Sequence, residues 1–76
     1  MAVTEKVKAL LSIKGKKNIE LAEHLGMSPQ SLQNNLNRGS FSAEDLIKIA
    51  DFTGATLAFE VNDNQKIVFE NTDIRG

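Results

Sequence analysis

Four amide side chains recur at helical spacing near the middle of this chain. They are Gln30, Gln33, Asn34 and Asn37. All four fall on the side of a predicted helix that faces away from Leu32 and Leu36. An amide donates and accepts hydrogen bonds at once, which suits the edges of nucleic-acid bases, including the paired acceptor and donor of adenine. Any one of them could be a plain exposed polar residue. Together they favour base recognition, with Gln30, Gln33 and Asn34 at base edges.

Other chemistry is poorly represented in the sequence. The chain has no cysteine and one histidine, so it offers neither a thiolate metal site nor a cluster of metal ligands. His24 stands on the polar flank of a predicted helix, where we expect an exposed surface residue. No nucleophile is spaced with a base, and no glycine-rich loop could hold a phosphate. We therefore expect no enzyme activity, no metal and no cofactor.

Two short helices joined by a tight turn must position the amides. Leu21, Ala22 and Leu25 give the first of them an apolar face. Gly26 can take a positive φ and end that helix. Ser28 is suited to be the N-cap of the second helix, with Pro29 at its first position. Residues 18–38 therefore predict a helix-turn-helix.

Two further helices are predicted on either side of this motif. The first contains Val3, Val7, Leu10 and Leu11 at helical spacing, with an N-cap near Thr4. Ser42 and Asp45 have the spacing of a capping box for the last helix, which would end at Gly54. The buried face of that helix is expected to carry Leu46, Ile49, Ala50 and Thr53.

After Gly54 the hydrophobic period changes from helical to alternating. Residues 56–61 and 66–70 both alternate, and the composition between them suits a turn. A two-stranded hairpin is marginal alone, so its apolar face must be covered either by its own helices or by a second subunit. We expect a homodimer, with strand edges paired between subunits. The candidate dimerisation residues are Leu57, Phe59, Val61, Ile67 and Phe69.

The totals indicate one small domain with an uneven charge. The chain has 76 residues and a net charge of −1. Residues 1–40 carry six basic and three acidic residues (+3), whereas residues 41–76 carry three basic and seven acidic residues (−4). The basic half contains the amides, as phosphate attraction would require. No apolar run has the length of a membrane span or of a secretory signal, so a cytoplasmic protein with no membrane partner is expected. Residues 71–76 lack periodicity and are expected to be mobile.

The segment ELAEHLGMSPQSLQNNLNRGSFSAEDLIKIAD resembles the helix-turn-helix core of the phage-repressor, Cro and xenobiotic-response-element family of bacterial and phage DNA-binding proteins. The matching positions are Leu21, Ala22, Leu25, Gly26, Ser28, Leu32 and Asn37 to Gly39. Two positions depart from the usual pattern: Asn35 and Lys16 replace residues that are often apolar. The resemblance implies a mainly α, four-helix, lambda-repressor-like bundle over residues 1–54, here followed by the hairpin at 55–70 in an α+β chain.

In that family the second helix of the motif enters the major groove of double-stranded DNA and the first crosses the backbone. A homodimeric transcriptional regulator, more often a repressor, acting on a palindromic operator is therefore expected. The candidate phosphate contacts are Lys17, Asn18, Ser28, Ser31, Asn37, Arg38 and Ser40. An alternative is an antitoxin-like module whose acidic hairpin half binds a partner protein.

Overall fold

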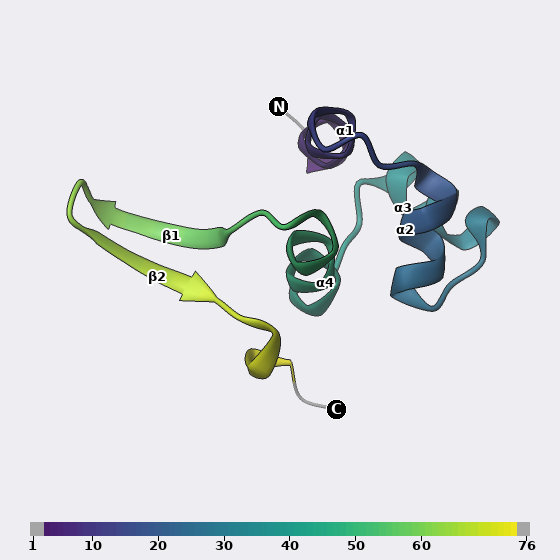
Figure 1. The fold of residues 1–76 in the computed structure, drawn as a ribbon. Coiled ribbons are helices and arrows are strands. Elements are labelled where there is room, and N and C mark those ends of the chain that lie inside the picture. Colours follow the sequence, from purple (N-terminus) through teal and green to yellow (C-terminus); the bar gives the residue numbers. More distant parts are fainter. Residues whose placement is uncertain (1–2, 75–76) are drawn as a thin grey trace.

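The computed structural model describes residues 3–74, which form four helices, a two-stranded hairpin and a short 3-10 turn (Figure 1). The helices are α1 (Val3–Ile13), α2 (Asn18–Leu25), α3 (Pro29–Arg38) and α4 (Ala43–Thr53). The antiparallel strands are β1 (Leu57–Asn62) and β2 (Gln65–Phe69), and the 3-10 turn η1 spans Asn71–Asp73. This order confirms the predicted mainly helical α+β architecture. No helix in residues 3–74 is long and apolar enough to cross a bilayer.

One apolar cluster joins the four helices. The side chains of Leu21, Leu32 and Leu36 are at most 2% exposed. Removing each such side chain from water stabilises the fold by roughly 1.5–3 kcal/mol. The small side chain of Ala22, also buried in the cluster, lets α2 and α3 cross closely. The buried members of the cluster are Val7, Leu11, Leu21, Ala22, Leu32, Leu36 and Ile49.

The caps around α3 match the sequence pattern. Gly26 ends α2 in the left-handed region at φ 71°. Two residues later Ser28 caps α3, with its Oγ accepting a hydrogen bond from the Ser31 N–H at 3.1 Å. Ser42 caps α4 in the same way, accepting from the Asp45 N–H at 3.0 Å. These two caps set where α3 and α4 begin.

The predicted cap of the first helix was wrong. Val3 is already helical, so Thr4 lies inside the first turn of α1. Its hydroxyl donates instead to the carbonyl oxygen of Leu36, in the last turn of α3. That carbonyl also accepts a hydrogen bond from the N–H of Gly39, the cap of α3, at 3.3 Å. The last carbonyls of a helix lack i+4 partners and so are open to such additional donors. Thr4 therefore ties α1 to the C-terminal end of α3.

The hairpin extends away from the helices (Figure 1). Leu57 pairs with Phe69 and Phe59 with Ile67, which places these four side chains on one face. The register slips between Glu60 and Asn62, so Val61 forms a bulge without a cross-strand partner. The outer part of this face is open: Phe59 is 63%, Val61 55% and Ile67 57% exposed. The hairpin's own helices therefore leave this part of its apolar face uncovered.

The segment predicted to be a mobile tail, residues 71–76, includes a short turn. Asn71–Asp73 form η1, which contacts α4. The Asp73 carboxylate accepts a hydrogen bond from the Glu70 N–H at 2.7 Å and so closes the turn. A single turn of 3-10 helix is too short to leave a periodic signal, so the sequence pattern missed it. Residues 75–76 of the predicted tail lie outside the described residues.

Candidate nucleic-acid interface

The outer face of α3 carries the predicted base-contacting residues. Gln30, Gln33 and Asn34 are all exposed, whereas Leu32 and Leu36 on the opposite side are at most 2% exposed. A helix turns about 100° per residue, so positions 30, 33, 34 and 37 form one continuous strip. The leucine seam anchors the helix on its inner side. The strip is thus held outward on a rigid element.

Within the strip, the amides pair with one another. Gln30 Nε2 donates to Asn34 Oδ1 at 3.3 Å, and Gln33 Nε2 donates to Asn37 Oδ1 at 2.9 Å. Each pair is one turn apart, and pairs of this kind stabilise a helix by roughly 0.2–0.5 kcal/mol. Pairing also restricts the rotamers of four long polar side chains before any ligand arrives. Asn37 therefore lies among the predicted base contacts, although the sequence placed it with the phosphate contacts.

The pairs retain hydrogen-bonding capacity. An amide has two N–H donors and two acceptor lone pairs. One hydrogen bond per pair leaves the Gln30 carbonyl oxygen as an acceptor and the Asn34 amide as a donor. An adjacent donor and acceptor can match the N7 and N6 groups of adenine in the major groove. The geometry of α3 is therefore compatible with direct recognition of base edges.

Asn35 is a residue whose place the sequence did not predict. It is half-buried at the edge of the leucine seam, where its Nδ2 lies 3.9 Å from Met27 Sδ. Its Oδ1 accepts a hydrogen bond from Arg38 Nη2 at 3.0 Å. Asn35 thus occupies a position that is often apolar in the resembling family, and it orients the arginine at the end of α3. The i, i+3 spacing of Asn35 and Arg38 was the sequence feature that could have predicted their contact.

Three serines lie near the ends of α3. Ser28 and Ser31 are exposed at its first turn, with the Ser28 Oγ donating to the Ser31 Oγ at 3.0 Å. Backbone N–H groups at the start of a helix attract anions, and Pro29 has none to contribute. Ser40 is exposed just beyond Gly39, which ends α3. Ser28 and Ser31 are brought together, whereas Ser40 lies at the other end of the helix.

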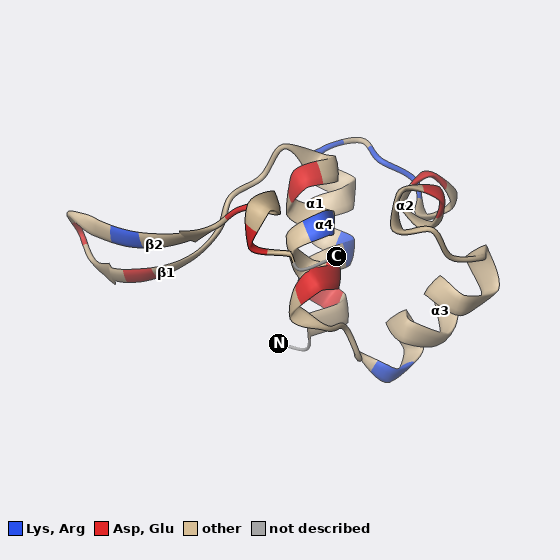
Figure 2. Ribbon diagram, turned by 90° about the horizontal axis from the view of Figure 1, so that it is seen from below, with Lys and Arg blue, Asp and Glu red and all other residues tan. Residues whose placement is uncertain are grey.

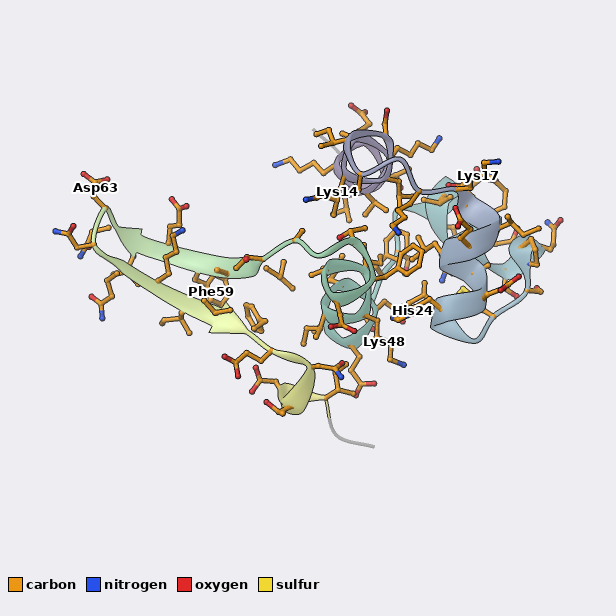
Figure 3. All side chains as sticks on the ribbon, in the orientation of Figure 1. Lys14, Lys17, His24, Lys48, Phe59 and Asp63 are labelled. Atoms are coloured by element: carbon orange, nitrogen blue, oxygen red, sulfur yellow. The ribbon has the colours of Figure 1, made fainter. Side chains whose placement is uncertain are left out.

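The predicted phosphate contacts Lys17 and Asn18 mark the start of α2. Both are exposed, and the Lys17 side chain extends into solvent (Figure 3). The Lys17 N–H is occupied, donating to Glu20 Oε1 at 3.0 Å. An eight-residue helix is about 12 Å long. Lys17 and Asn18 are therefore separated from the serines at the start of α3 by the length of α2.

The basic loop that joins α1 to α2 contains Lys14, Lys16 and Lys17. Of these, Lys16 has a different environment from Lys17. It is half-buried, and its Nζ lies 5.2 Å from the centroid of the Phe52 ring. A cation over an aromatic face is attracted to it, and the aliphatic stem can pack at the same time. This contact explains how a lysine occupies a position that is often apolar. It also removes Lys16 from the lysines that are free to meet a phosphate.

Charge is arranged unevenly around the two motif helices (Figure 2). The basic loop lies at the start of α2, and Arg38 lies at the far end of α3. Between them α3 carries no acidic residue, although α2 carries Glu20 and Glu23. Exposed charges act within a Debye length of roughly 8 Å at physiological salt. The basic groups at the two ends are thus placed to attract a polyanion without crowding the amide strip.

The histidine has no metal-binding environment. His24 packs on Phe52, with ring centroids 5.0 Å apart, and its Nε2 lies 4.0 Å from Asp51 Oδ2. In the part of the chain that the structure describes, no three histidine, aspartate or glutamate side chains converge on a metal-sized site. His24 therefore has a packing role at the boundary between α2 and α4.

Comparison with known proteins gave one match. The sequence model of the bacteriophage CI repressor helix-turn-helix domain matches residues 2–61. No curated protein and no solved structure matches the chain. The matched region contains all four helices and most of β1 and ends before β2. The chain therefore belongs to the bacteriophage CI repressor helix-turn-helix family, a non-enzymatic family of DNA-binding transcription regulators.

Proposed function

We propose that this domain binds a specific double-stranded DNA operator as a homodimer and represses transcription from it. The observation that carries the proposal is the strip of paired amides on the outer face of α3, free of acidic residues. Gln30, Gln33 and Asn34 are proposed to contact base edges. The proposed phosphate contacts are Lys17, Asn18, Ser28, Ser31, Asn37, Arg38 and Ser40. The domain would act on DNA inside a bacterial cell.

A two-fold dimer suits the modest charge of one subunit. With a net charge of −1, a single chain gains little non-specific attraction to DNA. Two linked recognition helices bind with an effective concentration that a single helix lacks. Two-fold symmetry would place them in successive major grooves, about 34 Å apart, on a palindromic site. The expected operator is therefore a palindrome with half-sites one helical turn apart.

Selection of bound duplexes from a random DNA pool tests the proposal. The expected result is an enriched palindrome for the natural sequence and weak or no enrichment for a Gln30→Ala, Asn34→Ala double variant. Because both positions are exposed, the variant should keep its fold, which circular dichroism checks. Recovery of the same palindrome by the double variant would refute the assignment of these residues. Recovery of no sequence by the natural protein would refute the proposed function.

The exposed hairpin face favours a second candidate function. Phe59 and Ile67 are more than half exposed, and large exposed apolar patches mark protein-interaction sites. An antitoxin-like module that binds a partner protein through this acidic half would leave the purified chain monomeric. A homodimer would instead sediment at twice the mass of one chain. Sedimentation at micromolar concentration separates the two candidates.

A further inference from the structure

An apolar groove lies beside the hairpin on the helical body. Its volume is about 280 Å³, and it runs between α1, α4 and the start of β1. Val7, Ile49 and Ala50 line its floor, while Val3 at the start of α1 is 44% exposed. Leu57 lines the groove and also begins the apolar face of the hairpin. The groove and this face therefore form one continuous apolar surface that nothing in residues 3–74 covers.

We infer that the outer part of the hairpin, carrying Phe59, Val61 and Ile67, docks into the α1–α4 groove of a second copy. The exchange is reciprocal, because a two-fold interface uses the same surfaces on both subunits. The hairpin of each subunit would then cover the α1–α4 groove of the other subunit. This inference rests on the homodimer of the proposed function and names the surfaces that form it.

Charge favours this occupant over hairpin-to-hairpin pairing. Residues 55–70 carry three acidic residues and one lysine, a net charge of −2. Helix α1 carries two lysines and one glutamate, a net charge of +1. Lys6 is the one charged residue that lines the groove, and the acidic residues of α4 do not line it. An acidic hairpin docked in the groove meets the positive charge of Lys6, whereas two paired hairpins meet like charge. The bulge at Val61 also interrupts the β1 edge, and bulges are a common device against edge pairing.

The shape of the chain supports the same choice. The molecule is 40 Å along its longest axis, and α3 and the tip of the hairpin lie at opposite ends of it (Figure 1). A six-residue strand accounts for about 20 Å of that length. Pairing two hairpins antiparallel, edge to edge, would leave their full length between the two helical bodies. The recognition helices would then lie well beyond the ~34 Å of successive major grooves. Laying each hairpin across the partner's body removes that separation.

Cysteine cross-linking between two variants tests the docking, since the natural chain has no cysteine. Val3→Cys places a thiol at the groove, and Val61→Cys places one on the hairpin. Both positions are substantially exposed, at 44% and 55%, so neither substitution should prevent folding. Mixing the two variants under mild oxidation, without DNA, should give a mixed disulfide dimer as the main cross-linked product. Lys8→Cys, an exposed α1 position that does not line the groove, should give at least fivefold less cross-link with Val61→Cys.

Three results would overturn the docking. They are a Val61→Cys dimer without the mixed product, equal cross-linking of Lys8→Cys, and a single-chain sedimenting mass at all concentrations up to the millimolar range. A recovered palindrome without the mixed disulfide would leave DNA binding standing and refute the docking alone. A mixed disulfide without any selected DNA sequence would support the docking and refute the proposed DNA binding.

Discussion

The outer face of α3 and the apolar face of the hairpin are both exposed, but their chemistry is opposite. On α3, paired amides cover the surface and a buried leucine seam lies behind them. On the hairpin, Phe59, Val61 and Ile67 are more than half exposed with no cover. Polar groups on a rigid helix suit a hydrated partner such as a base edge, because they need hydrogen bonds and not burial. An open apolar face gains stability when a partner removes it from water.

The two surfaces also differ in what supports them. Leu32 is 1% exposed and belongs to the apolar cluster, which contains residues from all four helices. By contrast, the outer half of the hairpin contacts little beyond its own two strands, where Phe59 meets Phe69 edge-on at a ring-centroid distance of 5.2 Å. Isolated hairpins are marginal in water. The stability of the fold should therefore depend strongly on the leucine seam behind α3 and weakly on the apolar face of the hairpin.

Truncating the α3 seam should have the largest effect. Leu32→Ala removes a side chain that is 1% exposed and should lower the free energy of unfolding by about 2–5 kcal/mol. The matched change on the hairpin, Ile67→Ala, should cost less than about 1 kcal/mol, because that side chain is already largely in water. Urea unfolding at low protein concentration, where association contributes least, measures both. Similar losses of unfolding free energy for Leu32→Ala and Ile67→Ala would show that the hairpin face is packed as firmly as the α3 seam.

Removing an amide side chain should reduce DNA sequence specificity more than it reduces the stability of the fold. Asn34→Ala should reduce discrimination between operator and scrambled DNA by about 1–3 kcal/mol, since a bidentate base contact is lost. Unfolding should change by less than about 0.5 kcal/mol, because the site is exposed. Gel-shift titrations with both duplexes provide the measurement. An equal loss of affinity on operator and scrambled DNA would show that Asn34 does not contact a base.

Two serine caps offer a sharper test of where DNA lies. Ser28→Ala and Ser42→Ala each remove an N-cap and should each destabilise the chain by about 1 kcal/mol. Only Ser28 lies at the start of α3, so only its variant should also lose DNA affinity, by about tenfold or less. Thermal unfolding and gel shifts are run on both variants. If Ser42→Ala weakened DNA binding as much as Ser28→Ala, the loss of affinity in both variants would come from lower stability and not from a lost contact with DNA.

The smallest effect is expected for a single lysine. Lys17→Ala should weaken operator and scrambled DNA equally and reduce the slope of log affinity against log salt by about 1. Helix α2 should be unaffected, since the Lys17 side chain makes no capping hydrogen bond. Lys66→Ala on the hairpin is the control and should leave the slope unchanged. A reduced slope for Lys66→Ala would indicate that DNA contacts the hairpin and would contradict the proposed interface on α2 and α3.

The helical part was largely predictable because its signals are local. Gly26, Ser28 and Ser42 act within a few residues of themselves, and the structure shows each of them in the predicted role. Thr4 was misassigned because its hydroxyl donates across 32 positions of sequence to Leu36. Lys16 and Asn35 looked like departures for the same reason: their partners, Phe52 and Met27, come from other elements.

Sequence alone determined which faces exist: the leucine seam, the amide strip, the alternating hairpin and the division of charge. Periodicity and capping are properties of neighbouring residues, so no tertiary contact is needed to detect them. Only the tertiary structure decided that the hairpin stands away from its own helices and that a groove opens beside it. Those two outcomes depend on how α1 and α4 pack at long range, and a period along the chain does not record the angle between elements.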